Sequence, residues 1–410
     1  MSKRNNLLIL ILGSLSALSP FSIDMYLPGF PAIARDLHTS VAKVSLSLSG
    51  FFVGISLGQL LYGPLLDRYG RKRPLYGGLV LYFLASVGCV FARSIEALIF
   101  LRIIQAIGSC AAAVAAIAMV RDLFPVEDSA KVFSLLMLVV GASPMLAPTI
   151  GGYVTAAFSW RVVFVILSVM SALLFAAVYF RLPESSKPDP SYSLKPGLIL
   201  KNFASVFSDI QFSTYALTGA LAFSGLFAYV AGSPLLFMDI FKLDEKQYGW
   251  IFALLSIGFI GSGQINSLLL KRYGSARIAF IALICQSVAG MILLAGTFNG
   301  WFGLTATIVM LFLFLTCLGF TFPNTSALSM APFSKNAGSA SALMGALQMI
   351  IGTLSSIAVS ILNPASALPM VIVMAVSALA ALLVLMIGSK RIKDHPENMI
   401  EPDGQVFTGH

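Results

Sequence analysis

The sequence predicts an all-α membrane protein with twelve transmembrane helices in two pseudo-symmetric six-helix bundles. Of its 410 residues, 58% are hydrophobic and only 10% are charged, whereas a soluble chain carries about 25% charged residues. Apolar runs of roughly 18 residues or more recur along the chain, and this is the length that a helix needs to cross a bilayer. A polytopic helical membrane protein therefore explains the chain better than two or three soluble domains.

Charges, glycines and prolines divide the apolar runs into twelve expected spans. The first six are residues 7–30, 43–63, 75–92, 95–120, 132–154 and 162–181. The second six are residues 211–236, 248–270, 278–298, 301–323, 338–361 and 367–389. The N-terminus resembles a signal peptide, but its apolar run is too long and lacks a convincing cleavage site before Pro20, so we expect an uncleaved span.

A long proline-rich loop separates the spans six and six. The apolar residues from Leu198 to Phe207 have helical spacing, which predicts an interfacial helix in the second half of this loop. The expected parts are an N-terminal bundle at 1–181, a cytoplasmic linker at 182–210, a C-terminal bundle at 211–389 and a cytoplasmic tail at 390–410.

An internal repeat supports the same division. The stretch Leu65–Arg73 follows the second span, and its Leu-Leu, Arg-Tyr-Gly and final Arg recur at the same relative positions in Leu269–Arg277, after the eighth span. Two parallel six-helix halves around a site near the midplane are a known plan of transporters.

The charge distribution predicts the topology. The net charge is +9, with 26 lysines and arginines, most of which fall in segments that would be cytoplasmic if the N-terminus is inside. This bias places both termini in the cytoplasm. The basic residues are thus explained by topology and by contact with membrane lipids, and nucleic acid is not implied.

Composition also argues against several classes of function. The four cysteines lie in apolar runs without metal-ligand or paired spacing, so we interpret them as core residues. The three histidines lie outside the spans, which argues against an intramembrane histidine relay, and no P-loop motif is present. We expect neither an enzyme nor a cofactor or metal site, for want of a nucleophile–base set or a metal cluster.

The segment Pro20–Pro31 is unusual within an apolar span. It contains three prolines, a glycine and Asp24, and lipid can neither satisfy the freed backbone groups nor solvate the carboxylate. We therefore expect Asp24 to face protein or a wet cavity, about 10 Å below the outer edge at 1.5 Å per residue. A proton-carrying carboxylate is the functional interpretation; a fixed buried pair or an interfacial, hydrated carboxylate is the structural one.

Arg102 on the fourth span is expected at a similar depth, roughly 11 Å. With Asp24 it is the only full charge well inside the expected spans, so an interaction across a cavity is possible. Arg102 would then govern protonation of Asp24. The alternative is a purely structural clamp between helices.

Three further motifs are candidate functional segments. The inner loop Gly63–Lys72 contains a carboxylate, Asp67, which can oppose a helix end or pair with a basic side chain and so favour one conformational state. The fifth span carries Pro144, Pro148, Gly151 and Gly152, a pattern that bends helices and permits close approach. The seventh span carries Phe223, Phe227 and Tyr229 beside Pro234, which suit either an aromatic pocket wall or ordinary packing.

Together these segments resemble the major facilitator superfamily. The inner loop is similar to its GxxxDRxGRR/K motif at Gly63, Asp67, Arg68, Gly70, Arg71 and Lys72. The fourth-span RxxQGxG motif is similar to the stretch from Arg102 to Gly108, with Gln105 matched and Ala106 in place of a glycine. The GPxxGG core of the antiporter motif resembles Ala147–Gly152, with Ala147 in place of the first glycine.

More narrowly, the chain resembles the bicyclomycin-resistance/chloramphenicol-resistance branch of drug:proton antiporters. The similar stretches are Ser22–Pro28, Phe227–Pro234, Gly319–Asn324 and Ala337–Gln348. Within the resembling segments and the aromatic motif, we predict substrate-binding roles for Tyr26, Gln105, Phe223, Phe227, Tyr229, Asn324 and Gln348.

The resemblance implies a monomeric multidrug efflux protein of the bacterial inner membrane that works by alternating access. Asp24 would take up a proton and Arg102 would govern its release, while Asp67 and the basic loop would stabilise the outward-open state. Its partners would be protons and small amphipathic drugs such as chloramphenicol or bicyclomycin. An exporter or proton symporter of a metabolite, for example an amino acid, is the alternative; a receptor without transport activity is disfavoured by the short tail and single long loop.

Overall fold

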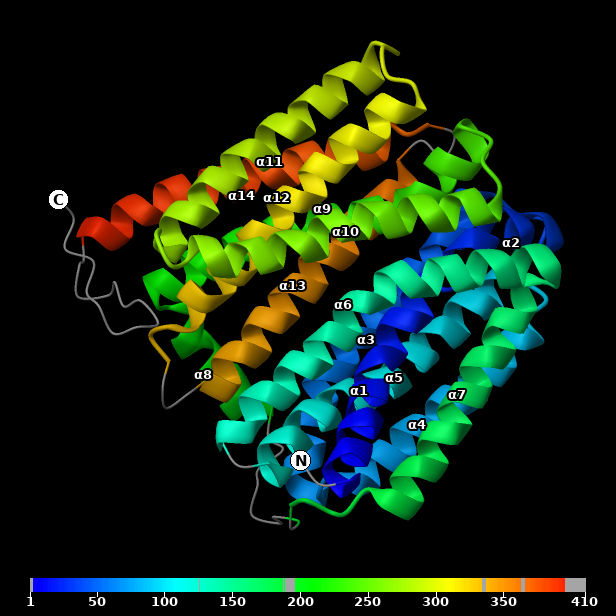
Figure 1. Cartoon of the computed structure of the whole chain (residues 1–410), viewed down its shortest axis with the longest axis vertical. Coiled ribbons are helices and arrows are strands. Elements are labelled where there is room, and N and C mark those ends of the chain that lie inside the picture. The colour runs from blue at the N-terminus through cyan, green and yellow to red at the C-terminus, as the bar shows by residue number, and fades with distance from the viewer. Residues whose placement is uncertain are drawn as a thin grey trace. The chain divides into compact units, whose positions relative to one another are not determined.

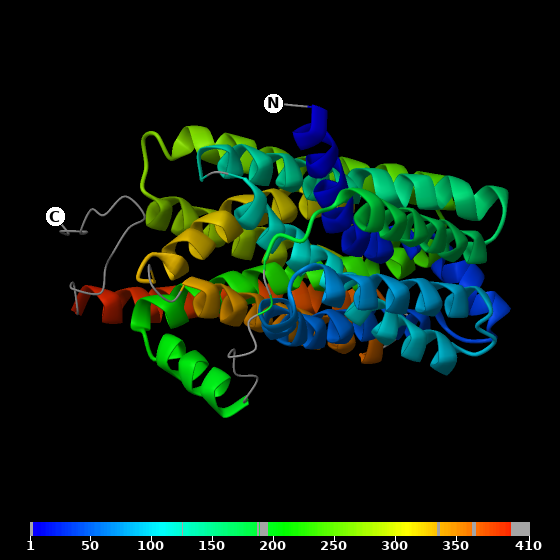
Figure 2. The same cartoon turned by 90° about the horizontal axis from the view of Figure 1, so that it is seen from below.

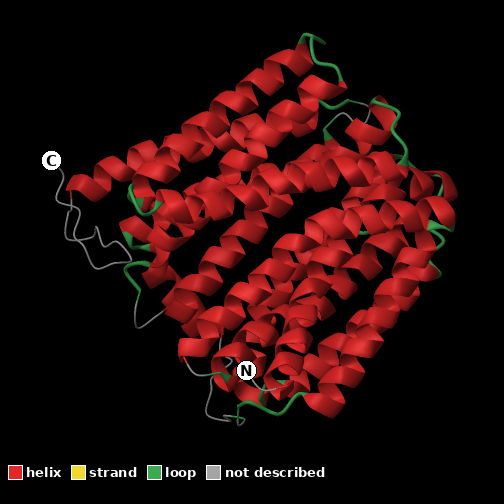
Figure 3. Cartoon of the chain, viewed as in Figure 1, coloured by secondary structure: helices red, strands yellow, loops and turns green. Residues whose placement is uncertain are grey.

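The computed structural model describes residues 3–124, 126–186, 188, 196–333, 337–362 and 366–394. Helices make up almost all of this part of the chain, and it contains no strand (Figure 3). The first helices are α1 (Lys3–Asp24), η1 (Leu27–Gly29), α2 (Phe30–Asp36), α3 (Val41–Tyr69), α4 (Lys72–Val90), α5 (Ile95–Leu123), α6 (Val126–Ala157) and α7 (Trp160–Arg181). The remaining helices are α8 (Pro196–Phe207), α9 (Ile210–Pro234), η2 (Leu235–Ile240), α10 (Glu245–Leu269), α11 (Ser275–Phe298), α12 (Leu304–Met330), α13 (Ala337–Ile361) and α14 (Leu368–Asp394).

The expected spans are confirmed. Within the described residues, eleven helical segments are long and apolar enough to cross a membrane, and the 32-residue helix α6 covers the remaining expected span, 132–154. Large apolar side chains such as Leu173, Ile281 and Leu383 are exposed along these helices, as expected where a surface meets lipid rather than water. The protein is therefore a multi-pass, all-α membrane protein.

Serine caps fix the start of three of these helices. The side chains of Ser40, Ser94 and Ser159 accept hydrogen bonds from backbone N–H groups in the first turns of α3, α5 and α7. Such caps satisfy donors that have no partner inside the helix. Short connections between capped helices set the antiparallel order of the bundle.

The chain forms two compact units. The first comprises residues 1–194 and 234–253, and the second residues 195–233 and 254–410. In the first unit α5 packs against α3 and α4, and α1 packs against α5 and α6; in the second, α11 packs against α12 and α14 (Figures 1 and 2). The division into bundles at 1–181 and 211–389 stays a prediction. In the structure, the segment 234–253 belongs to the first unit.

The predicted helix in the linker is present as α8. Its Val206 is buried in a cluster with Phe212, Ala216 and Ala340, whereas Phe207 remains exposed. Residues 187 and 189–195 of the linker and 395–410 of the tail lie outside the described residues. Contact of α8 with a membrane surface stays a prediction.

Candidate functional site

The predicted interruption of the first span begins directly after Asp24. α1 ends at this residue, and a short 3₁₀ turn, η1, containing Pro28 leads into α2. The N–H of Met25 still donates to the Phe21 carbonyl at 3.0 Å, and the N–H of Gly29 donates to the Tyr26 carbonyl at 2.9 Å. The turn is buried in protein, which is the environment that broken backbone requires in a membrane span.

Asp24 is a buried carboxylic acid without a hydrogen-bond or ion-pair partner in the described part of the chain. Its residue is 5% exposed, and no hydrogen bond or ion pair joins its carboxyl group to any described residue. It also lies at the C-terminal end of α1, where the helix dipole disfavours negative charge. Burial of a charge without a partner is costly, so this arrangement favours the neutral form of the carboxyl group.

Arg102 on α5 is completely buried. Its guanidinium donates to Gln105 Oε1 at 2.5 Å and to the Ser22 carbonyl at 2.7 Å, while Nε has no partner among the described residues. The rings of Tyr26 and Phe51 each lie 4.2 Å from its Cζ. The cation is thus held by neutral oxygens and aromatic faces, without a carboxylate.

The Asp24–Arg102 contact predicted from the sequence as possible is not an ion pair in this structure. The two residues nevertheless belong to one neighbourhood in the first unit. Arg102 binds the carbonyl of Ser22, two residues before Asp24, and stacks on Tyr26, two residues after it. The guanidinium therefore fixes the chain on both sides of the acid without neutralising it.

A hydrogen-bond network connects this neighbourhood to α4. Gln105 Nε2 donates to Ser86 Oγ at 2.7 Å, and the hydroxyls of Tyr82 and Ser22 lie 2.6 Å apart. The predicted residues Tyr26 and Gln105 are thus brought together with Arg102. Sequence reasoning missed Tyr82 and Ser86, because both lie in an apolar run without a motif.

Gly151 brings the fifth-span motif against the turn that follows Asp24. A Cβ at this position would overlap the Met25 carbonyl oxygen, and a Cβ at Gly152 would overlap that of Glu245. Only glycine permits such close approach of two backbones. The prolines Pro144 and Pro148 lie within α6, so the motif places a proline-containing helix directly against the residue after Asp24.

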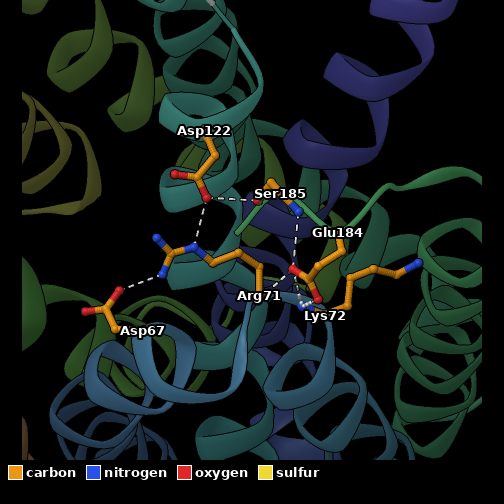
Figure 4. A network of polar contacts seen from close by, with 6 residues as sticks. All are labelled: Asp67, Arg71, Lys72, Asp122, Glu184 and Ser185. Atoms are coloured by element: carbon orange, nitrogen blue, oxygen red, sulfur yellow. Dashed lines mark hydrogen bonds and ion pairs between the residues drawn. The ribbon is translucent and has the colours of Figure 1, made fainter. Parts of the chain in front are cut away.

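The inner-loop motif builds a second polar site, centred on Arg71 (Figure 4). The guanidinium of Arg71 donates to Asp67 Oδ1 at 2.6 Å and to Asp122 Oδ2 at 2.9 Å, and Ser185 Oγ donates to the same Asp122 oxygen at 2.8 Å. Burial of Arg71 lowers its pKa, but the hydrogen bonds to Asp122 and Asp67 outweigh this effect and the pKa lies above its ordinary value.

Glu184 closes the Arg71 network from the other side. Its carboxylate accepts from the backbone N–H of Arg71 at 2.8 Å and from that of Lys72 at 3.1 Å, and therefore caps the N-terminus of α4. Gly70 adopts φ of 81°, a value that favours glycine, and delivers the chain into this cap. Sequence reasoning did not select Glu184 or Asp122, since both are distant in sequence from the loop.

The other residues of the inner-loop motif are less constrained. A Cβ at Gly63 would meet no atom within 4 Å, so close packing does not require this glycine. The Arg68 Cζ lies 5.7 Å from the Tyr69 ring centroid, and Lys72 Nζ lies 5.5 Å from that of Tyr76. Gating roles for these residues remain predictions.

In the second unit, Phe223 is the centre of an aromatic cluster. Its ring centroid lies 4.5 Å from that of Phe322, 5.7 Å from that of Phe227 and 6.3 Å from that of Phe259. Phe227 and Tyr229 are buried. These contacts fit ordinary packing as well as a pocket wall.

The two predicted polar residues of the second unit have different surroundings. Asn324 Nδ2 donates to Asn266 Oδ1 at 2.7 Å in the buried interior. Gln348 instead lines a cavity of about 10 Å³ with Tyr215 and Ser326, which is room for about one water. Of the predicted substrate residues, Tyr26 and Gln105 therefore lie together around Arg102 in the first unit. Those in the second unit lie in separate surroundings.

No group of His, Cys, Asp or Glu in the described part of the chain could hold a metal ion. In the first unit, Arg102 and Asp24 instead lie in one buried neighbourhood, and Arg71 forms a network with Asp67 and Asp122 at the inner loop. Such an arrangement is typical of a transport protein in which intramembrane charges are functional.

The family model of the Major Facilitator Superfamily matches residues 12–356. The chain therefore belongs to the major facilitator superfamily of transporters.

Relatives from several bacteria fit this assignment. The chain is 34% identical to an uncharacterized MFS-type transporter, YdgK, of Bacillus subtilis, over 90% of this chain and 92% of the relative. It is 31% identical to a bicyclomycin resistance protein homolog of Haemophilus influenzae, over 91% and 93% of the two chains. It is 27% identical to a chloramphenicol resistance protein of Pseudomonas aeruginosa, over 89% and 86%. The relatives thus include the drug-efflux branch that the sequence resembles.

Solved structures share the fold. The crystal structure of a D-xylose–proton symporter matches with a TM-score of 0.73 at 12% identity, covering 92% of this chain and 97% of the other. A bacterial homolog of the human lysosomal transporter Spinster, in an inward-facing and occupied conformation, matches with a TM-score of 0.73 at 15% identity, covering 98% and 100%.

Proposed function

We propose that this transporter exports small amphipathic compounds across the bacterial inner membrane in exchange for protons, by alternating access. The names of two relatives, a bicyclomycin resistance protein homolog and a chloramphenicol resistance protein, support this substrate class. Both termini would lie in the cytoplasm, as the distribution of lysine and arginine predicts.

The proposal rests on one observation, the burial of the Asp24 carboxyl group without a hydrogen-bond or ion-pair partner among the described residues. A carboxyl group in such a site is held at lower cost in its neutral form, and hydration or approach of Arg102 would favour the ionised form. If protonation and substrate favour different conformations of the protein, their binding is coupled. One proton moving inward supplies about 2.3 kcal/mol per 100 mV and about 1.4 kcal/mol per pH unit, which is sufficient for export.

The close contact of Gly151 with Met25 gives a mechanical link in this proposal. A shift of α6 would displace the turn after Asp24, because no side chain separates the two backbones. The Arg71 network would stabilise one conformational state through charge-assisted hydrogen bonds that break and re-form. Tyr26 and Gln105 would contact substrate beside Arg102.

The test uses purified protein in liposomes with an imposed pH gradient and a pH-sensitive dye. Chloramphenicol-driven proton release should be absent in Asp24→Asn, which cannot carry a proton. Asp244→Asn is the matched control, because Asp244 accepts the Gln247 N–H at the start of α10 and asparagine is an equally good cap. Normal proton release from Asp24→Asn would refute the assignment.

A growth screen across antibiotics in a pump-deficient host, with the unaltered chain beside Asp24→Asn, would identify substrates. The direction in which a proton gradient drives a transported compound separates this proposal from the metabolite symporter. Uptake driven by an inward proton gradient would replace export with symport.

A further inference from the structure

Three cations lie where α4 begins and α7 ends. Lys72 and Arg73 are the first two residues of α4, and Arg181 is the last residue of α7. The two helices pack against each other in the first unit (Figure 1). Arg73 and Arg181 are exposed, and none of the three cations forms an ion pair with a described residue.

The neighbouring carboxylates are already engaged. Both aspartates of the Arg71 network bind its guanidinium, and Glu184 accepts from backbone N–H groups at the start of α4. The side chain of Lys72 extends away from this network (Figure 4), and its Nζ lies 5.5 Å from the ring centroid of Tyr76. The three cations are therefore available to an anion from outside the protein.

Four aromatic rings lie beside these cations and form what we call the α4–α7 ladder: Tyr76, Phe175, Tyr179 and Phe180. The ring centroid of Tyr76 lies 5.3 Å from that of Phe175 and 6.2 Å from that of Tyr179. Tyr179 is 59% and Phe180 76% exposed. Tyrosine rings are enriched where a membrane meets water, so the ladder indicates the level of the lipid headgroups.

Exposed apolar side chains continue from the cations into the span. Val80 and Leu84 follow Arg73 by seven and eleven residues on one face of α4, a rise of roughly 10 and 16 Å, and they are 44% and 59% exposed. On α7, Leu173 precedes Phe180 by seven residues and is 65% exposed. A ligand on this surface meets cations at one end and apolar side chains beyond them, which suits a phospholipid.

We propose that Lys72, Arg73 and Arg181 bind the headgroup phosphate of phosphatidylglycerol, an anionic phospholipid, whose acyl chains follow the exposed faces of α4 and α7. Ammonium and guanidinium groups donate charge-assisted hydrogen bonds to phosphate oxygens, and basic surfaces between membrane helices bind headgroups of this kind. A zwitterionic lipid also presents a cation, which three unpaired cations repel. The site is independent of the substrate and proton roles proposed above.

The test measures lipid binding to the purified full chain in detergent by native mass spectrometry. Phosphatidylglycerol and phosphatidylcholine with the same acyl chains are supplied in equal amounts, and we expect at least a tenfold preference for phosphatidylglycerol. Lys72→Gln, Arg73→Gln and Arg181→Gln should each weaken its binding about fivefold, which corresponds to about 1 kcal/mol. Arg73→Lys with Arg181→Lys keeps the charges and should retain binding within about twofold.

The matched control for the three glutamine substitutions combined is the triple variant Lys271→Gln, Arg272→Gln and Arg277→Gln. These exposed cations lie at the internal repeat of the same loop, in the second unit, and the same charge is removed. The control should weaken phosphatidylglycerol binding less than about twofold. Equal losses in the two triple variants would reduce the site to general attraction between basic loops and anionic lipid and so overturn it.

Two further results would overturn the lipid site: no preference for phosphatidylglycerol in the unaltered chain, or its displacement by an excess of inorganic phosphate, which would indicate a site for free anions. Size-exclusion chromatography identifies the variants that fold.

The ladder is tested in the same measurement. Tyr179→Ala with Phe180→Ala should weaken phosphatidylglycerol binding about threefold, and Tyr179→Phe with Phe180 unchanged should retain it. Phe158→Ala, at an aromatic residue that is 75% exposed beyond the end of α6, is the matched control and should have no effect. Equal effects of the ladder variant and the control would remove the rings from the site.

Discussion

The Arg71 network and the surroundings of Arg102 hold their charges differently. At Arg71, two carboxylates contact one guanidinium and a third carboxylate caps a helix, so each charge meets an opposite charge or a helix end. Around Arg102 the cation contacts neutral oxygens and rings, and the neighbouring acid Asp24 makes no hydrogen bond or ion pair with a described residue. The first arrangement is suited to stabilise one conformation, and the second leaves an acid free to change its protonation state.

The location of the two regions explains the difference. Asp67 is 42% and Asp122 21% exposed at the side chain, so water lowers the cost of forming and breaking their ion pairs. Arg102 is fully buried, where a charge without compensation costs several kcal/mol. Substitutions in the buried region should therefore affect transport more than those in the network.

Arg102→Gln should have the largest effect. It removes two hydrogen bonds from a charged donor, each contributing about 1.5–3 kcal/mol, and it removes the cation that would influence Asp24. We expect at least a 100-fold loss of drug-driven proton release, which corresponds to about 2.7 kcal/mol. Arg93→Gln, at an exposed cation, is the control; equal activity of the two variants would contradict the role given to the buried guanidinium.

Gly151→Ala should have the next largest effect. Its Cβ would overlap a backbone oxygen, so α6 must move away from the turn after Asp24. We expect drug export, measured as the rate of loss of a preloaded fluorescent substrate, to fall by about tenfold or more, since overpacking costs about 1–3 kcal/mol.

Gly77→Ala is the matched control for Gly151→Ala. It lies within α4, and its Cβ would meet nothing within 4 Å. Alanine there should stabilise the helix by about 0.5–1 kcal/mol. Equal export by the two variants would show that close contact between α6 and the turn is unnecessary.

Glu184→Gln should have the smallest effect. Glutamine keeps an acceptor for the α4 N-terminus but loses the favourable charge, which is worth about 0.3–1 kcal/mol near a helix end. The midpoint of thermal unfolding in detergent should fall slightly, with less difference in high salt because exposed charges are screened. A loss that is equally large in low and high salt would instead indicate a packing defect.

Much of the fold could be predicted from the sequence because lipid imposes a length and a polarity on every span. The apolar runs located the helices, and the proline-rich stretch around Asp24 indicated the interruption between α1 and α2, where Pro28 lies. The motifs also identified Arg102, Gln105, Arg71 and Gly151 as residues to examine.

Contacts between distant residues were decided only by tertiary structure. The sequence placed Asp24 and Arg102 at similar depth, but depth does not fix side-chain direction, and Arg102 binds Ser22 and Gln105 instead. Glu184 lies 113 residues from Arg71, so no local pattern could reveal that it caps α4. Glycine positions illustrate the same limit, because Gly63 and Gly151 both belong to motifs. Only the packing shows that a Cβ on Gly151 would overlap another backbone, whereas a Cβ on Gly63 would meet no atom within 4 Å.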